Sequence, residues 1–92
     1  MVTFADVERI LEWARRTGHK VRVKFRGCPY LLAIDKYIYA EGPGGRKVEW
    51  ARAFGPKPPH QVLSSYGVEY VEVSGPSGTS RVRDIRELLR MV

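Results

Sequence analysis

The first apolar residues of the chain recur every three or four positions, which is the spacing of one face of a helix. They are Phe4, Val7, Ile10, Leu11 and Ala14. Thr3 and Asp6 resemble a capping box, and Gly18 stands where a left-handed C-terminal cap is expected. The pattern predicts an amphipathic helix from Thr3 to Thr17.

Strict alternation follows in the segment KVRVKFR, residues 20–26. Three apolar side chains share one face of this extended segment: Val21, Val23 and Phe25. Four cations share the other face: Lys20, Arg22, Lys24 and Arg26. The alternation predicts a strand with one face on the core and the other in water.

Two β-rich runs come next, over residues 30–34 and 36–41. Asp35 marks either a bend between two strands or the middle of one long bent strand. The sequence Gly-Pro-Gly-Gly at 42–45 is a strong turn signal. We therefore expect the chain to reverse direction at 42–45.

The segment after this turn predicts a hairpin arm over residues 46–52, with Val48 and Trp50 on one face. The proline-rich stretch 54–59 predicts a loop, because proline removes a backbone donor and fixes φ.

The rest of the chain predicts a short helical turn, a strand, a hairpin turn, its return arm and a final helix, over residues 60–66, 68–73, 75–78, 79–83 and from Asp84 onward. Asp84 and Glu87 form a capping box for that helix. This order indicates the α+β class, with an antiparallel β-sheet of four to six strands and an N-terminal and a C-terminal helix packed on it. At 92 residues the chain supports one core, so we expect residues 1–92 to form a single domain.

The net charge of +6 is unevenly distributed along the chain. Residues 15–57 contain eleven cations and three acids, a net charge of +8, and the other residues carry a net charge of −2. Concentrated like charge repels itself, so this distribution favours a function in binding an anion.

Six of the ten aromatic residues lie in the same stretch: Phe25, Tyr30, Tyr37, Tyr39, Trp50 and Phe54. Phe25 aligns with the apolar face of its strand and is expected in the core. Core packing is also favoured for Tyr30, which leads an apolar strand, and for Trp50, which shares a face with Val48. If Ile38 and Ala40 face the core, Tyr37 and Tyr39 both face solvent beside cations and form a stacking platform for bases. The alternatives are that the tyrosines pack under a helix, and that the basic strand face only protects the sheet from aggregation.

The chain carries no recognisable catalytic or metal-binding motif. His19, His60 and Cys28 lack metal-ligand spacing, and the glycines of 42–45 are not followed by the Lys-Ser/Thr ending of a phosphate-binding P-loop. We therefore expect no metal, no cofactor and no catalysis. Two alternatives stay open: a protein-interaction subunit whose basic face meets an acidic partner, and a small metal-independent ribonuclease using Tyr37, Tyr39 and Arg22.

Other features of composition bear on source, location and assembly. The chain has no Asn, a single Gln and eleven Arg, a pattern of hyperthermophiles that predicts a thermophilic archaeal or bacterial source. No apolar run approaches a membrane span, and the single Cys28 rules out a disulfide framework, so we expect a cytoplasmic protein without membrane contact. An edge strand and the apolar C-terminal helix permit a homodimer.

The opening helix, the strand KVRVKF and the arms KYIYAEG and RKVEWAR together resemble the ThermoDBP-type single-stranded DNA-binding proteins of hyperthermophilic archaea and their relatives. The resemblance lies in the organisation of about 80 residues. It implies an antiparallel sheet flanked by helices that holds single-stranded DNA in a basic, partly apolar cleft without catalysis.

We therefore predict a non-enzymatic protein that binds single-stranded nucleic acid, with DNA favoured over RNA. Three aromatic residues are expected to stack bases: Tyr37, Tyr39 and Trp50. Seven cations are expected to neutralise phosphates: Arg22, Lys24, Arg26, Lys36, Arg46, Lys47 and Arg52.

Overall fold

The computed structural model describes residues 1–92 and contains one six-stranded sheet with four α-helices. The strands are β1 (Lys20–Phe25), β2 (Leu31–Ile34), β3 (Ile38–Glu41), β4 (Lys47–Val48), β5 (Val68–Gly75) and β6 (Gly78–Val82). The helices are α1 (Phe4–Thr17), α2 (Trp50–Phe54), α3 (Pro59–Ser65) and α4 (Ile85–Leu89), with one 3-10 turn, η1 (Pro43–Gly45). All strand pairs are antiparallel, in the order β4-β3-β2-β1-β5-β6, which confirms the α+β prediction.

Helix α1 forms as the sequence predicts. The Thr3 side chain accepts a hydrogen bond from the backbone N–H of Asp6, and the Asp6 carboxylate accepts one from the N–H of Thr3. Gly18 ends the helix with φ of 72°, a left-handed conformation that costs glycine little. Four residues of the predicted apolar face, Val7, Ile10, Leu11 and Ala14, are buried in the core, so the helix covers one face of the sheet, whereas Phe4 in the first turn is exposed.

Strand β1 is the central strand of the core. Its side chains Val21, Val23 and Phe25 are fully buried, and the strand pairs with β2 on one side and β5 on the other. Residues 30–41 form two strands rather than one long one, because the chain turns at Asp35 between Ile34 and Ile38. The predicted bend is therefore a tight reversal.

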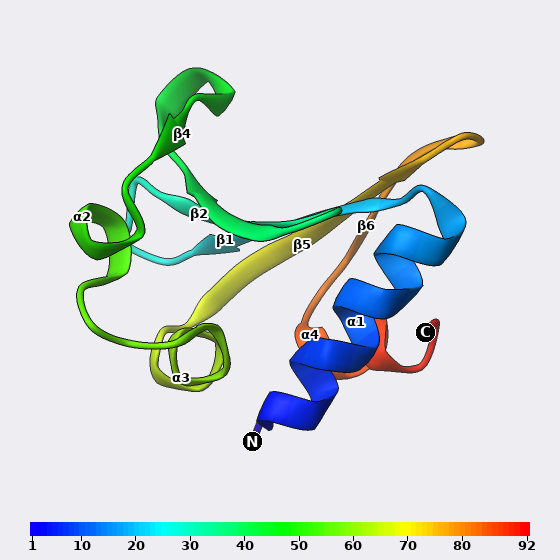
Figure 1. The fold of residues 1–92 in the computed structure, drawn as a ribbon, viewed down its shortest axis with the longest axis horizontal. Coiled ribbons are helices and arrows are strands. Elements are labelled where there is room, and N and C mark those ends of the chain that lie inside the picture. Colours follow the sequence, from blue (N-terminus) through cyan, green and yellow to red (C-terminus); the bar gives the residue numbers. More distant parts are fainter.

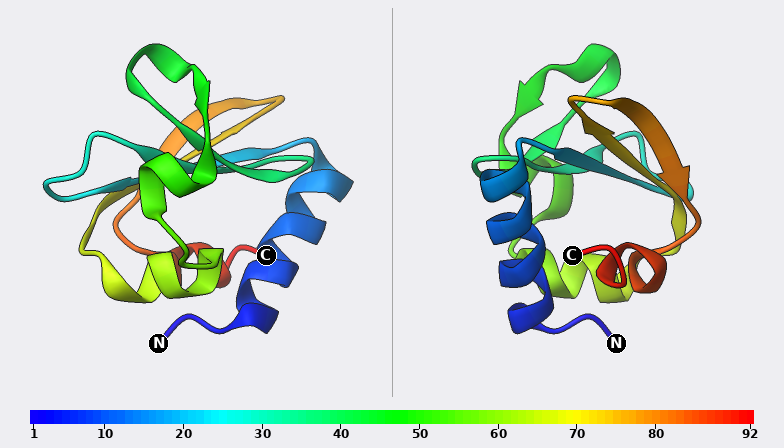
Figure 2. Two further views of the ribbon diagram at one scale, coloured as in Figure 1. Left: turned by 60° about the vertical axis from the view of Figure 1, so that its left-hand side comes forward. Right: turned by 90° about the vertical axis from the view of Figure 1, so that its right-hand side faces the viewer.

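The helices lie together on one side of the sheet, as the ribbon views show (Figures 1 and 2). The core fills the space between them and the sheet, and Phe54 of α2 packs edge-on against Phe25 with ring centroids 5.8 Å apart. We call the opposite side of the sheet the outer face; no helix covers it. The helices are short, and none has the length and apolarity needed to cross a membrane.

The predicted hairpin arm over residues 46–52 is wrong beyond Val48. Only Lys47 and Val48 pair with β3, and the chain enters α2 at Trp50. Trp50, Ala53 and Phe54 stand at helical spacing and pack on the core, and this period overrides the alternation of Val48 and Trp50.

The predicted loop over residues 54–59 is also shorter in the structure. Phe54 belongs to α2, and Pro59 opens α3, a first helical position at which the missing N–H of proline costs nothing. Helix α3 ends at Ser65, so Tyr66 and Gly67 lie beyond it.

The end of β5 approaches the imidazole of His19 closely. That ring stacks on Trp13, with centroids 4.4 Å apart, and its Nδ1 lies 2.6 Å from the hydroxyl of Thr17. A Cβ on Gly75 would overlap the imidazole, whereas a Cβ on Gly67 would meet its nearest atom, Cδ of Arg26, at 3.6 Å.

We predict that Gly75→Ala lowers the free energy of unfolding by about 1–3 kcal/mol through overpacking, because the held imidazole cannot move aside easily. Gly67→Ala is the matched control and should stay within about 1 kcal/mol of the wild type. Chemical denaturation measures both. In a double-mutant cycle, His19→Ala should remove most of the cost of Gly75→Ala; an unchanged cost would contradict the proposed overlap.

Candidate nucleic-acid interface

The pairing register determines which side chains share the outer face, because residues paired across strands project to the same side of a sheet. The outer face carries Lys20, Arg22, Lys24, Leu31, Ala33, Tyr39, Glu41, Lys47, Tyr70, Glu72 and Arg81. Five cations and two carboxylates are therefore gathered around two tyrosines.

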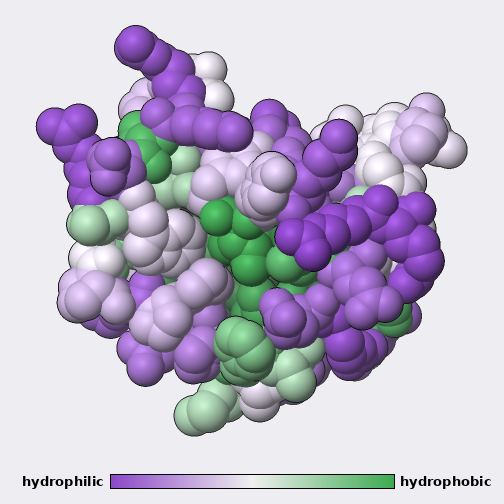
Figure 3. Space-filling view, viewed as in Figure 1, coloured by the Kyte–Doolittle hydropathy of each residue, from purple (hydrophilic) through white to green (hydrophobic).

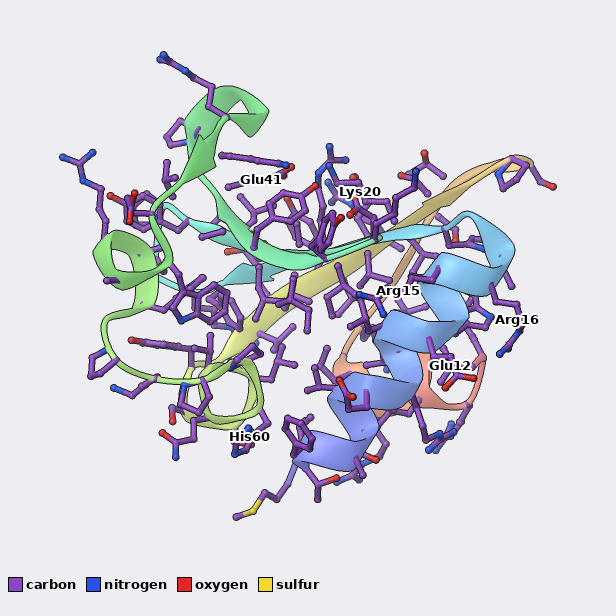
Figure 4. The ribbon with its side chains drawn as sticks, in the orientation of Figure 1. Glu12, Arg15, Arg16, Lys20, Glu41 and His60 are labelled. Atoms are coloured by element: carbon purple, nitrogen blue, oxygen red, sulfur yellow. The ribbon has the colours of Figure 1, made fainter.

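Glu41 lies at the centre of the charged contacts on this face. Its side chain is only 4% exposed, although the residue lies on the side of the sheet without helices. Oε2 accepts a hydrogen bond from Nζ of Lys20 at 2.8 Å, and Oε1 accepts one from Nε of Arg22 at 2.9 Å. Figure 4 shows Lys20 and Glu41 on the side of the sheet away from α1. The two cations cover the carboxylate and bury it.

These contacts change the proton affinity of Glu41. Burial alone raises the pKa of a carboxyl group, but the hydrogen bonds and charges of Lys20 and Arg22 outweigh it and hold the pKa of Glu41 below its usual value. The carboxylate therefore stays ionised on the outer face at neutral pH.

A second carboxylate extends the network toward β6. Glu72 accepts a hydrogen bond from Nη1 of Arg22 at 3.3 Å, and Arg81 approaches its other oxygen at 3.9 Å. The guanidinium of Arg81 also lies 3.9 Å from the centroid of the Tyr70 ring, within cation–π distance. Arg22 of β1 thus joins the Glu41 carboxylate of β3 and the Glu72 carboxylate of β5.

Tyr39 is the aromatic residue at the centre of the predicted interface. Its hydroxyl donates to Oδ2 of Asp35 at 3.0 Å. The ammonium of Lys47 lies 4.7 Å from its ring centroid and that of Lys20 lies 5.4 Å away. Burial and the hydrogen bond to Asp35 raise the pKa of Tyr39, although Lys20 acts in the opposite direction. The half-buried ring is thus held in place at its hydroxyl and lies close to two cations.

Tyr37 and Lys36 occupy the turn between β2 and β3, not a strand. Backbone N–H groups of both residues donate to Oδ1 of Asp35, which shapes the turn. The side chain of Tyr37 projects from this turn and is 67% exposed. Tyr37 and Tyr39 therefore lie near one end of β3, with Tyr37 the more accessible of the two.

Lys24 has a different role from the one the alternation predicts. It lies on the outer face, but its ammonium donates to the carbonyl oxygens of Phe25 and Cys28, at 2.8 and 2.7 Å. It therefore closes the turn that follows β1. Arg26 lies in that turn, beyond the end of β1, and is exposed.

The remaining predicted residues lie at the β4 edge of the sheet. Arg46 and Lys47 are exposed beside η1, and Figure 3 shows hydrophilic side chains projecting at this corner, at the upper left. Trp50 and Arg52 belong to α2 rather than to a strand. The indole of Trp50 donates to the carbonyl oxygen of Lys57 at 2.7 Å and packs on Phe54, so Trp50 does not join the tyrosines of the outer face.

Sequence reasoning missed several members of the outer face: Glu41 as its centre, and Tyr70, Glu72 and Arg81 from the C-terminal part of the chain. The alternation of residues 68–73 already places Tyr70 and Glu72 on one side of a strand. The sequence pattern does not show that β5 pairs with β1. This pairing places Glu72 and Tyr70 beside the basic residues of β1.

No protein-family model matches the chain, and neither a curated protein nor a solved structure matches it. The resemblance to the ThermoDBP-type proteins stays a prediction. No group of three His, Cys, Asp or Glu side chains lies close enough to hold a metal ion, and Cys28 is a free thiol.

We predict that Glu41→Gln lowers the free energy of unfolding at pH 7 by about 1–3 kcal/mol, because Lys20 and Arg22 lose their shared carboxylate. The pKa of Glu41 is lowered by folding, so its contribution is complete above the unfolded value of about 4.3 and is lost as the pH falls through the lower folded value. The difference from the wild type should therefore shrink below about pH 4.

Urea denaturation between pH 7 and pH 3 measures this effect. Glu69→Gln is the matched control, since Glu69 is an exposed glutamate of β5 without an ion pair. If the wild type and Glu41→Gln lose stability in parallel as the pH falls, the assignment is wrong.

Proposed function

We propose that the protein binds single-stranded nucleic acid along the β3 side of the outer face, without catalysis. DNA is favoured over RNA, in line with the resemblance to the ThermoDBP-type proteins. The observation that carries the proposal is the setting of Tyr39 and Tyr37. Tyr39 lies beside Lys20 and Lys47 on a sheet face that no helix covers, and the exposed Tyr37 projects from the turn that leads into β3.

Ring accessibility supports a single strand rather than a duplex. Bases stack on an aromatic side chain only when their faces are free, and each stacked base contributes about 1–3 kcal/mol. Tyr37 is exposed enough to accept such a base. Tyr39 can take a second base once Lys47 moves from the ring to a phosphate.

The distribution of ion pairs supports phosphate binding at the margins of the face. Lys20 and Arg22 are already paired with Glu41, so they attract a phosphate less strongly than free cations do. Arg26, Lys36, Arg46 and Lys47 form no ion pair with a carboxylate. These four cations supply the charge for the proposed strand.

Binding should depend steeply on salt. With about four to six phosphates neutralised, log K should fall against log salt with a slope of about −3 to −4. Fluorescence polarisation with labelled single-stranded DNA, single-stranded RNA and duplex DNA across a salt series measures the slope and the preference. Binding that is absent at low salt, or independent of salt, would overturn the proposal.

The same experiment separates the alternative classes. Cleavage of the labelled RNA, with or without EDTA, would identify an enzyme rather than a pure binder. Binding of heparin, together with no binding of any oligonucleotide, would point to an acidic protein partner.

Tyr37→Ala should weaken binding of single-stranded DNA about fivefold to a hundredfold, the loss of one stacked base. Phe4→Ala is a matched control, because Phe4 is an aromatic residue of α1 with 64% exposure, close to the 67% of Tyr37. Its affinity should match the wild type within about twofold. Equal losses in the two variants would remove the stacking platform from the proposal.

A further inference from the structure

A basic hollow lies at the β4 edge of the sheet, beside the outer face. It is a wide, open hollow with a volume of about 870 Å³, and it lies between the Gly42–Pro43 turn, β4 and the start of α2. Its charged lining residues are Arg46, Lys47, Glu49 and Arg52. None of these four takes part in an ion pair.

The local fold brings these cations together. Gly44 and Gly45 have φ of 82° and 79°, values that favour glycine, and they reverse the chain so that Arg46 and Lys47 follow on the edge strand. Strand β4 then stops after two residues, and α2 places Arg52 on the same hollow. Three cations thus converge from a turn, a strand and a helix.

The charge of the hollow indicates which anion it fits. Three cations and one carboxylate give a net charge of +2. A phosphate monoester carries a charge of about −1.5 to −2 at neutral pH and has three strong acceptor oxygens. A phosphodiester inside a strand carries a single negative charge and would leave part of the positive charge of the hollow unbalanced. Two arginines also suit a phosphate, since each guanidinium can donate two parallel hydrogen bonds.

We propose that this hollow binds a phosphate monoester at the end of a nucleic-acid strand. The inference rests on the proposed function, since the strand is the one whose bases stack on Tyr39 and Tyr37. Lys47 connects the two sites, because it lines the hollow and its ammonium lies 4.7 Å from the Tyr39 ring. The protein would thus hold a strand by its phosphorylated end, with the first bases on the outer face.

Matched oligonucleotides test the assignment. We would measure the affinity for one short DNA strand with a 5′-phosphate, with a 3′-phosphate and with hydroxyl groups at both ends. One of the two phosphorylated strands should bind at least about tenfold more tightly than the hydroxyl-ended strand. In Arg52→Gln this ratio should fall to about one. In Arg90→Gln, which removes an exposed, unpaired cation next to α4, the ratio should stay as in the wild type.

Free phosphates identify the source of the monoester. Inorganic phosphate and a nucleoside monophosphate should compete only weakly with the phosphorylated strand. Inorganic phosphate has no base to stack, and the monophosphate has only one. A monophosphate that binds as tightly as the phosphorylated strand would make a free metabolite the ligand and overturn the strand-end assignment.

The outcomes separate this inference from the proposed function. Equal affinity for all three strands would overturn end recognition and leave single-strand binding intact. If no strand binds but inorganic phosphate shifts the Arg52 side-chain NMR signal, the hollow is an anion site and the proposed function is wrong. If neither a strand nor phosphate binds, both are wrong.

Discussion

The buried carboxylate of Glu41 determines how the outer face is arranged. Alternate residues of β1 place three cations in a row on a surface that no helix covers, and such a row repels itself. Glu41 accepts hydrogen bonds from two of the three, and Arg22 reaches on to Glu72. One acid on β3 therefore stabilises the strand at the centre of the sheet.

Because these cations are paired, the unpaired cations near the outer face lie around its centre rather than in it. The centre of the outer face is a set of satisfied ion pairs, whereas Lys36 in the turn before β3 and Arg46, Lys47 and Arg52 at the β4 edge form no ion pair. Tyr39 lies between these two regions, since its ring contacts Lys20 of the paired centre and Lys47 of the β4 edge. Three unpaired cations are therefore gathered at the β4 edge of the sheet.

The sequence was sufficient to predict most of the fold, because the apolar residues of most elements repeat at either the helical or the strand spacing, but not at both. The capping box at Thr3, the alternation in β1 and the glycine turns each specify local structure by themselves. Trp50 is an exception, because its position fits both the strand period shared with Val48 and the helix period shared with Phe54. Packing on the core decides in favour of the helix. The use of the Lys24 ammonium could not be predicted either, because its acceptors are carbonyl oxygens whose positions depend on the turn.

The strand order also has a consequence for folding kinetics. Strands β1, β2 and β3 are neighbours in the chain and can pair as a meander, whereas β1 meets β5 across more than 40 residues of intervening chain. Loop closure makes that pairing slow relative to the local hairpins. We therefore expect β1, β2 and β3 to be paired in the folding transition state, with Glu41 already bonded to Lys20 and Arg22. Strand β5 would then join β1 after the transition state and complete the core. Glu41 should then accelerate folding, whereas Glu72, which arrives with β5, should mainly slow unfolding.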